Sequence, residues 1–437
     1  MRALKNRSRL PSFCVSIFLF AATIFLHGCG GGSYNTTPWL DSSNSSVRPA
    51  QQQPNDISVA AVDEQALDAP MFGDNANGES LAPVKVAILL PLTGQHAKLG
   101  QSMLNAAQMA LFDIGYNNFE LMPKDTKGTP DGARAAARSA LQDGAKLVLG
   151  PVFSTSVKAA RQVTQSANVN MIAFSTDWTL ANSQTFLIGL LPFDQIERVV
   201  RYASANGYKR IGVISPTNTY GNGVVSAYRA ISQQAGVETA RIERFSTQDK
   251  NMASIMRLFS DYDARKSANN AYGPPFDAVL MPVGGPTARE LGSFLNHYDL
   301  RPNQVKRLGT GLMDDKSLAQ DKTLDGAWYA APDPQSRKKF ERRYLSAYRS
   351  SPPRIASLAY DATALSAILA RIGLKNTGRP AYDHRSITNP NGFSGVDGIF
   401  RFRPDGIAER GLAIMEYKNG RIVVIDNAPK TFQNRAF

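Results

Sequence analysis

Hydroxyl-bearing side chains follow directly after three of the apolar stretches in this sequence. The segments are "GPVFSTS", "AFSTDW" and "PTNTYGNG", and the residues are Ser154, Ser175, Thr176 and Tyr220. A hydroxyl both donates and accepts hydrogen bonds, so this set suits the carboxylate or ammonium of a small polar ligand. The same residues also suit structural roles: a helix N-cap for Ser154, a strand-end turn for Ser175 and Thr176, and a packed aromatic for Tyr220.

Residue patterns for catalysis are weak. The chain has four histidines, His27, His96, His297 and His384, and no pair of them has metal-ligand spacing. The Gly-x-Ser-x-Gly elbow, the P-loop and the dinucleotide fingerprint do not occur in it. The sequence therefore predicts a binding protein with no catalytic residue, metal site or cofactor, rather than an enzyme.

The first 29 residues have the pattern of an export signal. Four basic residues precede the 14-residue apolar stretch "FCVSIFLFAATIFL", which ends at "LHGCGGG". Small residues before Cys29 resemble a bacterial lipobox, so we predict that Cys29 carries lipid such as palmitate; the alternative is a plain secretory signal. Gly30 favours the outer membrane of a Gram-negative envelope, with the protein facing the periplasm. After cleavage Cys14 is lost, so no disulfide is expected.

Residues 30–83 are rich in Ser, Asn, Gln, Pro and Gly, and this composition predicts a disordered linker. The whole chain carries a net charge of +13; residues 1–29 contribute +4 and the linker −6, which leaves +15 for residues 84–437. So large a positive charge favours binding to an anionic partner, such as an acidic polymer, lipid headgroups or an acidic protein face. Alternatively, the charge serves only to keep the protein soluble. Nucleic acid is not expected as a partner.

From Val84 the sequence alternates short apolar runs with helical periodicity, beginning with "VKVAILLP" and a helix face of Leu104, Ala107, Leu111 and Ile114. Such alternation predicts an α/β fold of two Rossmann-like lobes, whose parallel sheets are joined by crossovers. A single helix is expected at 251–265 and a β-hairpin or meander near the C-terminus. The expected lobes are about 84–192 with 310–375, and about 193–309 with 376–427, followed by a tail at 428–437.

Residues 84–427 resemble the type I periplasmic binding proteins, especially the leucine/isoleucine/valine-binding branch. The resemblance rests on "ILLPLTGQHAKLG", "LVLGPVFSTSV", "NMIAFST", "RIGVISPTNTYGNGV" and "FSGVDGIFRFRPDG". Within that group, "GQSMLNAAQMALFD" is similar to the lipoprotein activators of penicillin-binding proteins. The resemblance implies an interlobe cleft in which Ser154, Ser175, Thr176 and Tyr220 face a small polar ligand. Leu99 stands where the receptors often have an aromatic residue near that ligand.

One departure from the receptors concerns the ligand ammonium. Where the resemblance places an ammonium-binding acid, this chain has Gly309, Thr310 and Gly311, and Asp314 and Asp315 follow only later. A buried ammonium without a counter-charge costs several kcal/mol. The sequence thus favours a regulator of a peptidoglycan synthase, that is a penicillin-binding protein, over the alternative of a receptor that delivers an amino acid or related ligand to an ABC permease.

The densest run of positive charge is "RKKFERRYLSAYR" at 337–349. Phe340, Tyr344 and Tyr348 recur at helical spacing and share one face. The pattern fits a surface helix with a buried aromatic stripe, and it also fits a docking patch for an acidic protein or glycan.

Overall fold

The computed structural model describes residues 82–432, apart from 247–250 and 270–271. The predicted signal peptide, the Cys29 lipid site, almost all of the linker and the last five residues of the tail lie outside the described residues. Within the described ranges, no helix is long and apolar enough to span a bilayer.

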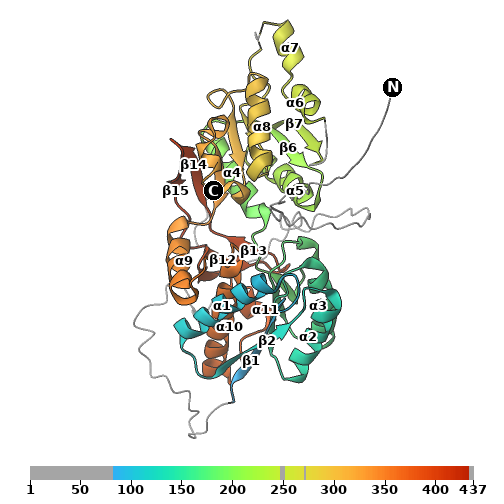
Figure 1. The fold of residues 1–437 in the computed structure, drawn as a ribbon, viewed down its shortest axis with the longest axis vertical. Coiled ribbons are helices and arrows are strands. Elements are labelled where there is room, and N and C mark those ends of the chain that lie inside the picture. The colour runs from blue at the N-terminus through green and yellow to red at the C-terminus, as the bar shows by residue number, and fades with distance from the viewer. Residues whose placement is uncertain (1–81, 247–250, 270–271, 433–437) are drawn as a thin grey trace, which may run out of the picture. The chain divides into compact units, whose positions relative to one another are not determined.

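The first lobe is built on a parallel five-stranded sheet in the order β2-β1-β3-β4-β5 (Figure 1). Its strands are β1 (Val84–Leu90), β2 (Phe119–Asp125), β3 (Leu147–Leu149), β4 (Met171–Ala173) and β5 (Thr185–Leu187). All of β1, β3, β4 and β5 is buried apart from Lys85, as expected for a sheet covered on both faces.

Helices cover both faces of this sheet. They are α1 (Ala97–Ile114), α2 (Pro130–Gln142), α3 (Ser154–Ser166) and α10 (Ala356–Thr377). The helices α1 and α10 pack on one face, and α2 and α3 pack on the other with short alanine side chains (Figure 1). The Ala/Leu-rich α10 is largely buried because it packs against both α1 and the sheet in the core of the first lobe.

The second lobe has a seven-stranded sheet in the order β15-β14-β10-β9-β8-β6-β7. Its strands are β6 (Arg210–Pro216), β7 (Glu238–Phe245), β8 (Ala278–Leu280), β9 (Lys306–Gly309), β10 (Trp328–Ala331), β14 (Ala413–Lys418) and β15 (Arg421–Asp426). The pairing is parallel from β7 to β10, whereas β14 and β15 join antiparallel at the edge beside β10. The fold class is therefore the predicted one, with an antiparallel edge added.

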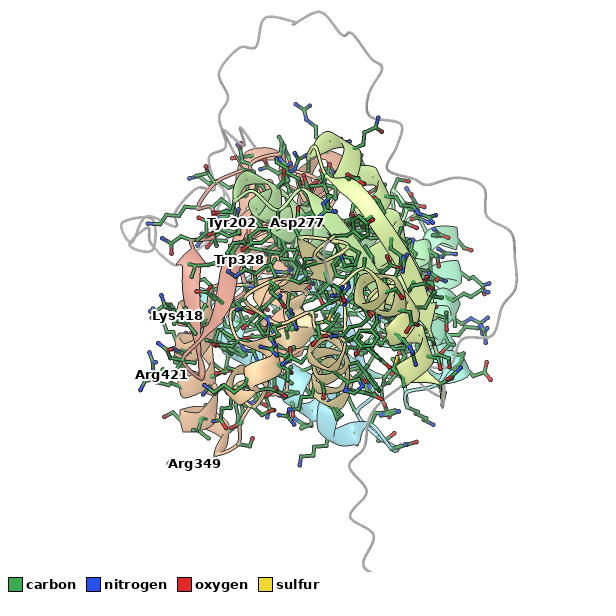
Figure 2. The ribbon with its side chains drawn as sticks, turned by 90° about the horizontal axis from the view of Figure 1, so that it is seen from above. Tyr202, Asp277, Trp328, Arg349, Lys418 and Arg421 are labelled. Atoms are coloured by element: carbon green, nitrogen blue, oxygen red, sulfur yellow. The ribbon has the colours of Figure 1, made fainter. Side chains whose placement is uncertain are left out.

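The faces of the second sheet are covered by α4 (Pro192–Ala205) and α5 (Thr219–Gln234) on one side. On the other side lie α6 (Met252–Phe259) and α8 (Gly285–His297). The single helix predicted at 251–265 is wrong, because it breaks into α6 and α7 (Tyr262–Ser267) at Asp261, whose backbone is left-handed with φ 54°. On the α4 side, Trp328 packs edge-on against Tyr202 (Figure 2).

Three segments cross between the lobes: residues 188–191 after β5, residues 332–333 after β10, and residues 411–412 before β14. Strand pairing corrects two of the predicted boundaries. Since β10 pairs with β9, the segment from 310 to 331 belongs to the second lobe rather than the first. Since Phe393, Phe400 and Phe402 pack in the core of the first lobe, the segment from 376 to 410 belongs there rather than to the second.

The predicted C-terminal meander is split between the lobes. A small antiparallel sheet of β11 (Phe393–Gly395), β12 (Gly398–Phe402) and β13 (Ala408–Arg410) sits on the first lobe, next to the short helix α11 (His384–Ile387). The hairpin of β14 and β15 instead extends the second sheet. Helix α9 (Pro334–Tyr348) packs on the first lobe through Phe340 and Tyr344, so the aromatic stripe of the basic helix is buried against α1 and α10.

Candidate functional site

Ser154, Ser175 and Thr176 lie at one edge of the first sheet. Their segments follow β3 and β4, which are parallel neighbours, so both start from the same carboxyl edge. Ser154 is the first residue of α3 and is half-buried. It is not the N-cap: Phe153 holds that position in extended backbone, and the helix has no side-chain cap. Ser175 is buried and its Oγ accepts from the Asp177 N–H at 3.1 Å, whereas Thr176 is exposed.

Tyr220 lies in the first turn of α5, in the second lobe. Asn218 caps this helix by accepting from the Gly221 N–H at 2.8 Å, which fixes the position of Tyr220. The Tyr220 hydroxyl donates to Thr310 Oγ1 at 2.8 Å, and burial raises the pKa of Tyr220 above its usual range. Leu99 lies instead on α1, where it packs half-buried against the core of the first lobe.

Trp178 connects the two groups of predicted residues. It follows Thr176 by two positions and packs edge-on against Phe193 at the start of α4, with ring centroids 5.5 Å apart. A Cβ at Gly223 would lie 2.7 Å from the Trp178 ring, so the glycine is needed for the ring to rest on α5. The loop after β4 in the first lobe therefore contacts the helix that carries Tyr220 in the second.

A cavity of about 880 Å³ opens beside the three crossover segments. We call it the crossover cavity, and its lining includes Leu190, Leu191, Ala331, Pro332 and Leu412 from those segments or their ends. Of the predicted ligand residues, Tyr220 lines this cavity, and Leu99, Ser154, Ser175 and Thr176 do not. The size falls within the range of cavities that hold small molecules.

Among the charged residues that line the crossover cavity, bases outnumber acids. Its positively charged side chains are Lys316, Arg337, Lys338, Arg354, Arg410 and Arg421. Its acids are Asp194, Asp314 and Glu341. Lys316 and Arg421 come from the second lobe, and Arg421 follows the β14–β15 turn close to Lys418 (Figure 2). The cavity is thus suited to an anionic ligand rather than a cationic one.

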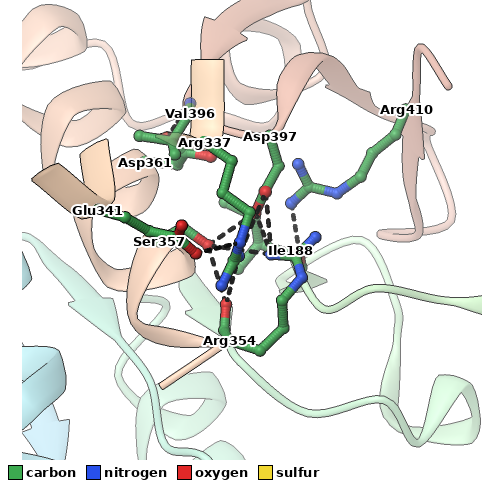
Figure 3. Close-up of polar contacts among 9 residues, drawn as sticks. All are labelled: Ile188, Arg337, Glu341, Arg354, Ser357, Asp361, Val396, Asp397 and Arg410. Carbon is green, nitrogen blue, oxygen red and sulfur yellow. Dashed lines mark hydrogen bonds and ion pairs between the residues drawn. The ribbon is translucent and has the colours of Figure 1, made fainter. Parts of the chain in front are cut away.

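Behind the wall of the crossover cavity lies a buried carboxylate that holds two of these arginines (Figure 3). The fully buried Asp397 accepts from Arg354 Nη1 at 2.9 and 3.0 Å and from Ser357 Oγ at 2.7 Å. The Nη1 atom of Arg337 lies 3.8 Å from Asp397, and Arg337 Nε pairs with Glu341 at 2.7 Å. Burial works to raise the pKa of Asp397, but the charges of Arg354 and Arg410 outweigh it and lower that pKa.

A second buried carboxylate, Asp361 on α10, sits beside Asp397. Burial raises the pKa of Asp361 to about 7, the negative charge of Asp397 adds to the shift, and Arg410 opposes it. One carboxylate oxygen accepts from the Val396 N–H at 2.7 Å, and the other has no hydrogen-bond partner within the described part of the chain. A Cβ at Gly395 would lie 2.6 Å from that second oxygen, so a glycine is required there.

Sequence reasoning overlooked Arg354, Asp361, Asp397 and Arg410. Asp361 could have been identified from the sequence, because it interrupts the Ala/Leu-rich face of a helix that must be buried. A buried acid needs hydrogen-bond or ion-pair partners. Asp397 carries no such signal, because "GVDG" reads equally well as a turn. Across residues 82–432, with the gaps given above, no cluster of three or more His, Cys, Asp or Glu side chains is placed to hold a metal ion.

Two curated proteins illustrate what this chain is similar to. The penicillin-binding protein activator LpoA of Photobacterium profundum is 28% identical over 191 residues, which is 42% of this chain and 31% of that protein. The Leu/Ile/Val-binding protein BraC3 of Rhizobium johnstonii is 26% identical over 249 residues, which is 54% of this chain and 64% of that protein. The chain therefore matches less than two thirds of the length of either relative.

Solved structures share the fold at low sequence identity. An ABC transporter substrate-binding protein from Sphaerobacter thermophilus matches with a TM-score of 0.61 and 18% identity, over 80% of this chain and 98% of that one. A substrate-binding protein from Desulfitobacterium hafniense, solved in complex with Leu, matches with a TM-score of 0.55 and 18% identity, over 78% of this chain and all of that one. These likenesses show the type I periplasmic binding fold.

The sequence also matches a family as a whole. The sequence profile of the periplasmic binding proteins aligns with residues 83–421, which covers both lobes. The two relatives named above are an activator and a binding protein, and together with the family they imply a periplasm-facing protein of the cell envelope. With the sheet order and the crossovers in agreement, this chain belongs to the periplasmic binding protein family.

Proposed function

We propose that this protein is a regulator that acts by direct contact on a peptidoglycan synthase of the penicillin-binding protein class, tethered to the outer membrane by lipid on Cys29. The likeness to an LpoA activator supports the partner class. The observation that carries the proposal is the hydrogen bond from Tyr220 to Thr310, since Thr310 lies in the stretch where the family resemblance places an ammonium-binding acid.

That pair consists of two neutral hydroxyls, so it supplies no counter-charge for an ammonium at the end of β9. Thr310 is buried, and its hydroxyl accepts from both Tyr220 and the Leu312 N–H. The next acid along the chain, Asp314, accepts from the buried Tyr329 hydroxyl at 3.2 Å. An ammonium held beside Thr310 would lose its hydration without gaining an ion pair, which costs several kcal/mol.

Leucine, isoleucine and valine are therefore expected to bind with dissociation constants weaker than about 1 mM, corresponding to less than about 4 kcal/mol of binding free energy. Isothermal titration of the full chain in detergent measures this directly, and a cooperative thermal transition in the same sample shows that the protein is folded. Binding of any of the three at micromolar concentration would contradict the proposed reading of the Thr310 site and favour a transport receptor.

The exposed face of α9 supports contact with an acidic protein surface. Lys339 and Arg342 are exposed on this helix, while its aromatic stripe is turned inward. Arg343 differs from them because it forms an ion pair with Asp113 on α1. Near that pair, Phe112 is 87% exposed and adds an apolar contact of the kind that interfaces use.

Reversing the charge at both Lys339 and Arg342 (to Glu) is expected to weaken association with a solubilised penicillin-binding protein about tenfold, mainly by slowing the on-rate. Added salt should weaken the wild-type association in the same direction. The matched control reverses Arg138 and Lys158, which are exposed on α2 and α3, the helices of the opposite face of the first lobe. Equal loss in both double variants, or recovery of a permease in place of a synthase, would count against the proposal.

A receptor that serves an ABC permease is the second candidate, favoured by the likeness to BraC3 over 54% of the chain. In that case Ser154, Ser175, Thr176 and Tyr220 would contact a small polar ligand between the lobes. A receptor should bind a branched-chain amino acid in the titration and recover a permease from solubilised membranes. A regulator should fail to bind the amino acids and should recover a penicillin-binding protein.

A further inference from the structure

The crossover cavity differs from the predicted ligand cleft in the residues of its first-lobe wall. That wall includes Arg337 and Lys338 from α9 and Arg354, which lies two residues before α10. The three first-lobe hydroxyls, Ser154, Ser175 and Thr176, take no part in it. The opposite wall comes from the second lobe and includes Lys316 and Arg421.

The acids of the lining are already engaged by protein groups. Asp194 accepts from the Arg410 backbone N–H at 2.7 Å, and Asp314 accepts from the Tyr329 hydroxyl. Glu341 pairs with Arg337. Hydrogen bonds do not remove the negative charge of Asp194 and Asp314, but the six cations of the lining outnumber its three acids.

Three lining cations remain available to a ligand. Within the described residues, Lys316, Lys338 and Arg421 form no ion pair with any acid. They are contributed by both lobes, so an anion with charges at two ends can contact both walls at once. Like charges facing one cavity repel each other, and a bound anion removes that repulsion.

Arg354 adds a donor group that is held in place from behind. All the hydrogen bonds that it donates within the described residues leave from Nη1, toward Asp397 and Ser357. Its Nε and Nη2 therefore have no partner in that part of the chain, and the side chain is 33% exposed. A guanidinium fixed in this way presents its remaining N–H groups to carboxylate or phosphate oxygens with little loss of conformational freedom.

We propose that the crossover cavity binds a small anion that carries two or more carboxylate or phosphate groups, held by Arg354 and Lys338 of the first lobe and by Lys316 and Arg421 of the second. The synthase regulator assigns no ligand to this cavity, and the transport receptor shares only Tyr220 with its lining. Anion binding is therefore tested apart from the amino-acid titration and the recovery of a membrane partner.

Titration of the full chain in detergent with citrate and, separately, with pyrophosphate tests the proposal at constant ionic strength. Saturable one-to-one binding of either probe is expected, and acetate, with a single charge, should bind at least about tenfold more weakly because it contacts one wall only. The citrate and pyrophosphate arms distinguish a carboxylate ligand from a phosphate ligand. Absence of saturable binding in both arms would overturn the proposal.

Variants locate the bound anion. Lys316→Gln and Lys338→Gln each remove an exposed cation without breaking an ion pair, and each should weaken binding of the preferred probe about three- to tenfold. Arg342→Gln is the matched control, since Arg342 lies on the same helix as Lys338 but outside the cavity lining, and its affinity should stay within about twofold of the wild type. Unchanged affinity in both lysine variants, or an equal loss in Arg342→Gln, would refute the site.

Discussion

Replacing Arg354 by alanine is expected to lower the free energy of unfolding by about 3–5 kcal/mol, because it leaves the fully buried Asp397 carboxylate without its main partner. Ser357 would still donate one hydrogen bond, but Arg337 lies 3.8 Å away and is also paired with Glu341. Urea unfolding of the full chain, followed by circular dichroism, measures the change.

The double variant Arg354→Ala with Asp397→Asn should recover part of this loss, since the amide carries no charge that needs a counter-ion. Arg342→Ala serves as the control for loss of an arginine on a nearby exposed helix and should change stability by less than about 0.5 kcal/mol. Equal destabilisation by Arg342→Ala and Arg354→Ala, or no recovery in the double variant, would show that Asp397 does not depend on this pairing.

Replacing Asp361 by asparagine is expected to stabilise the protein above pH 7 and to have little effect near pH 4. The pKa of Asp361 is raised from 3.8 to about 7 in the folded protein, so between these values the folded state holds a proton that the unfolded state has lost. The contribution of Asp361 to the free energy of unfolding therefore falls as the pH rises from 3.8 to about 7. Above that range the carboxylate is charged in the folded protein, and the whole desolvation penalty of its burial applies.

The size of the gain follows from the shift. Each unit of pKa corresponds to about 1.4 kcal/mol, which gives an upper value of about 4 kcal/mol for Asp361. The protonated acid also places a donor at the oxygen that lacks a partner, so the N–H₂ of asparagine adds little further cost, and the gain at pH 8 should approach but not exceed about 4 kcal/mol. Urea unfolding at pH 5 and pH 8 compares this variant with Asp131→Asn, whose carboxylate is 94% exposed. A difference from wild type that is identical at both pH values would contradict the assignment.

Most of the fold follows from hydrophobic periodicity. The strand β1, for example, falls within the predicted apolar run "VKVAILLP" and ends before Pro91. Hydrophobic periodicity does not show which other strand a given strand pairs with. "LDGAWYAAP" reads as a buried strand in either lobe, and pairing with β9 decides its place. Likewise, residues 398–402 and 413–418 both alternate like hairpin strands, yet they join different sheets.

The candidate site was less accessible from the sequence. Of the residues that the family resemblance suggested, Tyr220 lines the crossover cavity because its helix is capped directly after β6. Arg354 and Asp397 are 43 residues apart and lie on segments that look like a loop and a turn, so only the packing of β11 and β12 against α10 brings them together. Local sequence does not encode a contact of that kind.

The position of β14 has a consequence for biogenesis. This strand lies between β10 and β15, more than 80 residues after β10 in the chain, and the intervening residues complete the first lobe with α10 and the β11–β13 sheet. A chain that emerges from its N-terminus therefore lacks the long helix α10 of the first lobe until residue 377 and an edge of the second sheet until residue 426. Until then the β10 edge is open to pairing with other chains, so a holding chaperone is most needed while residues 332–426 are being added.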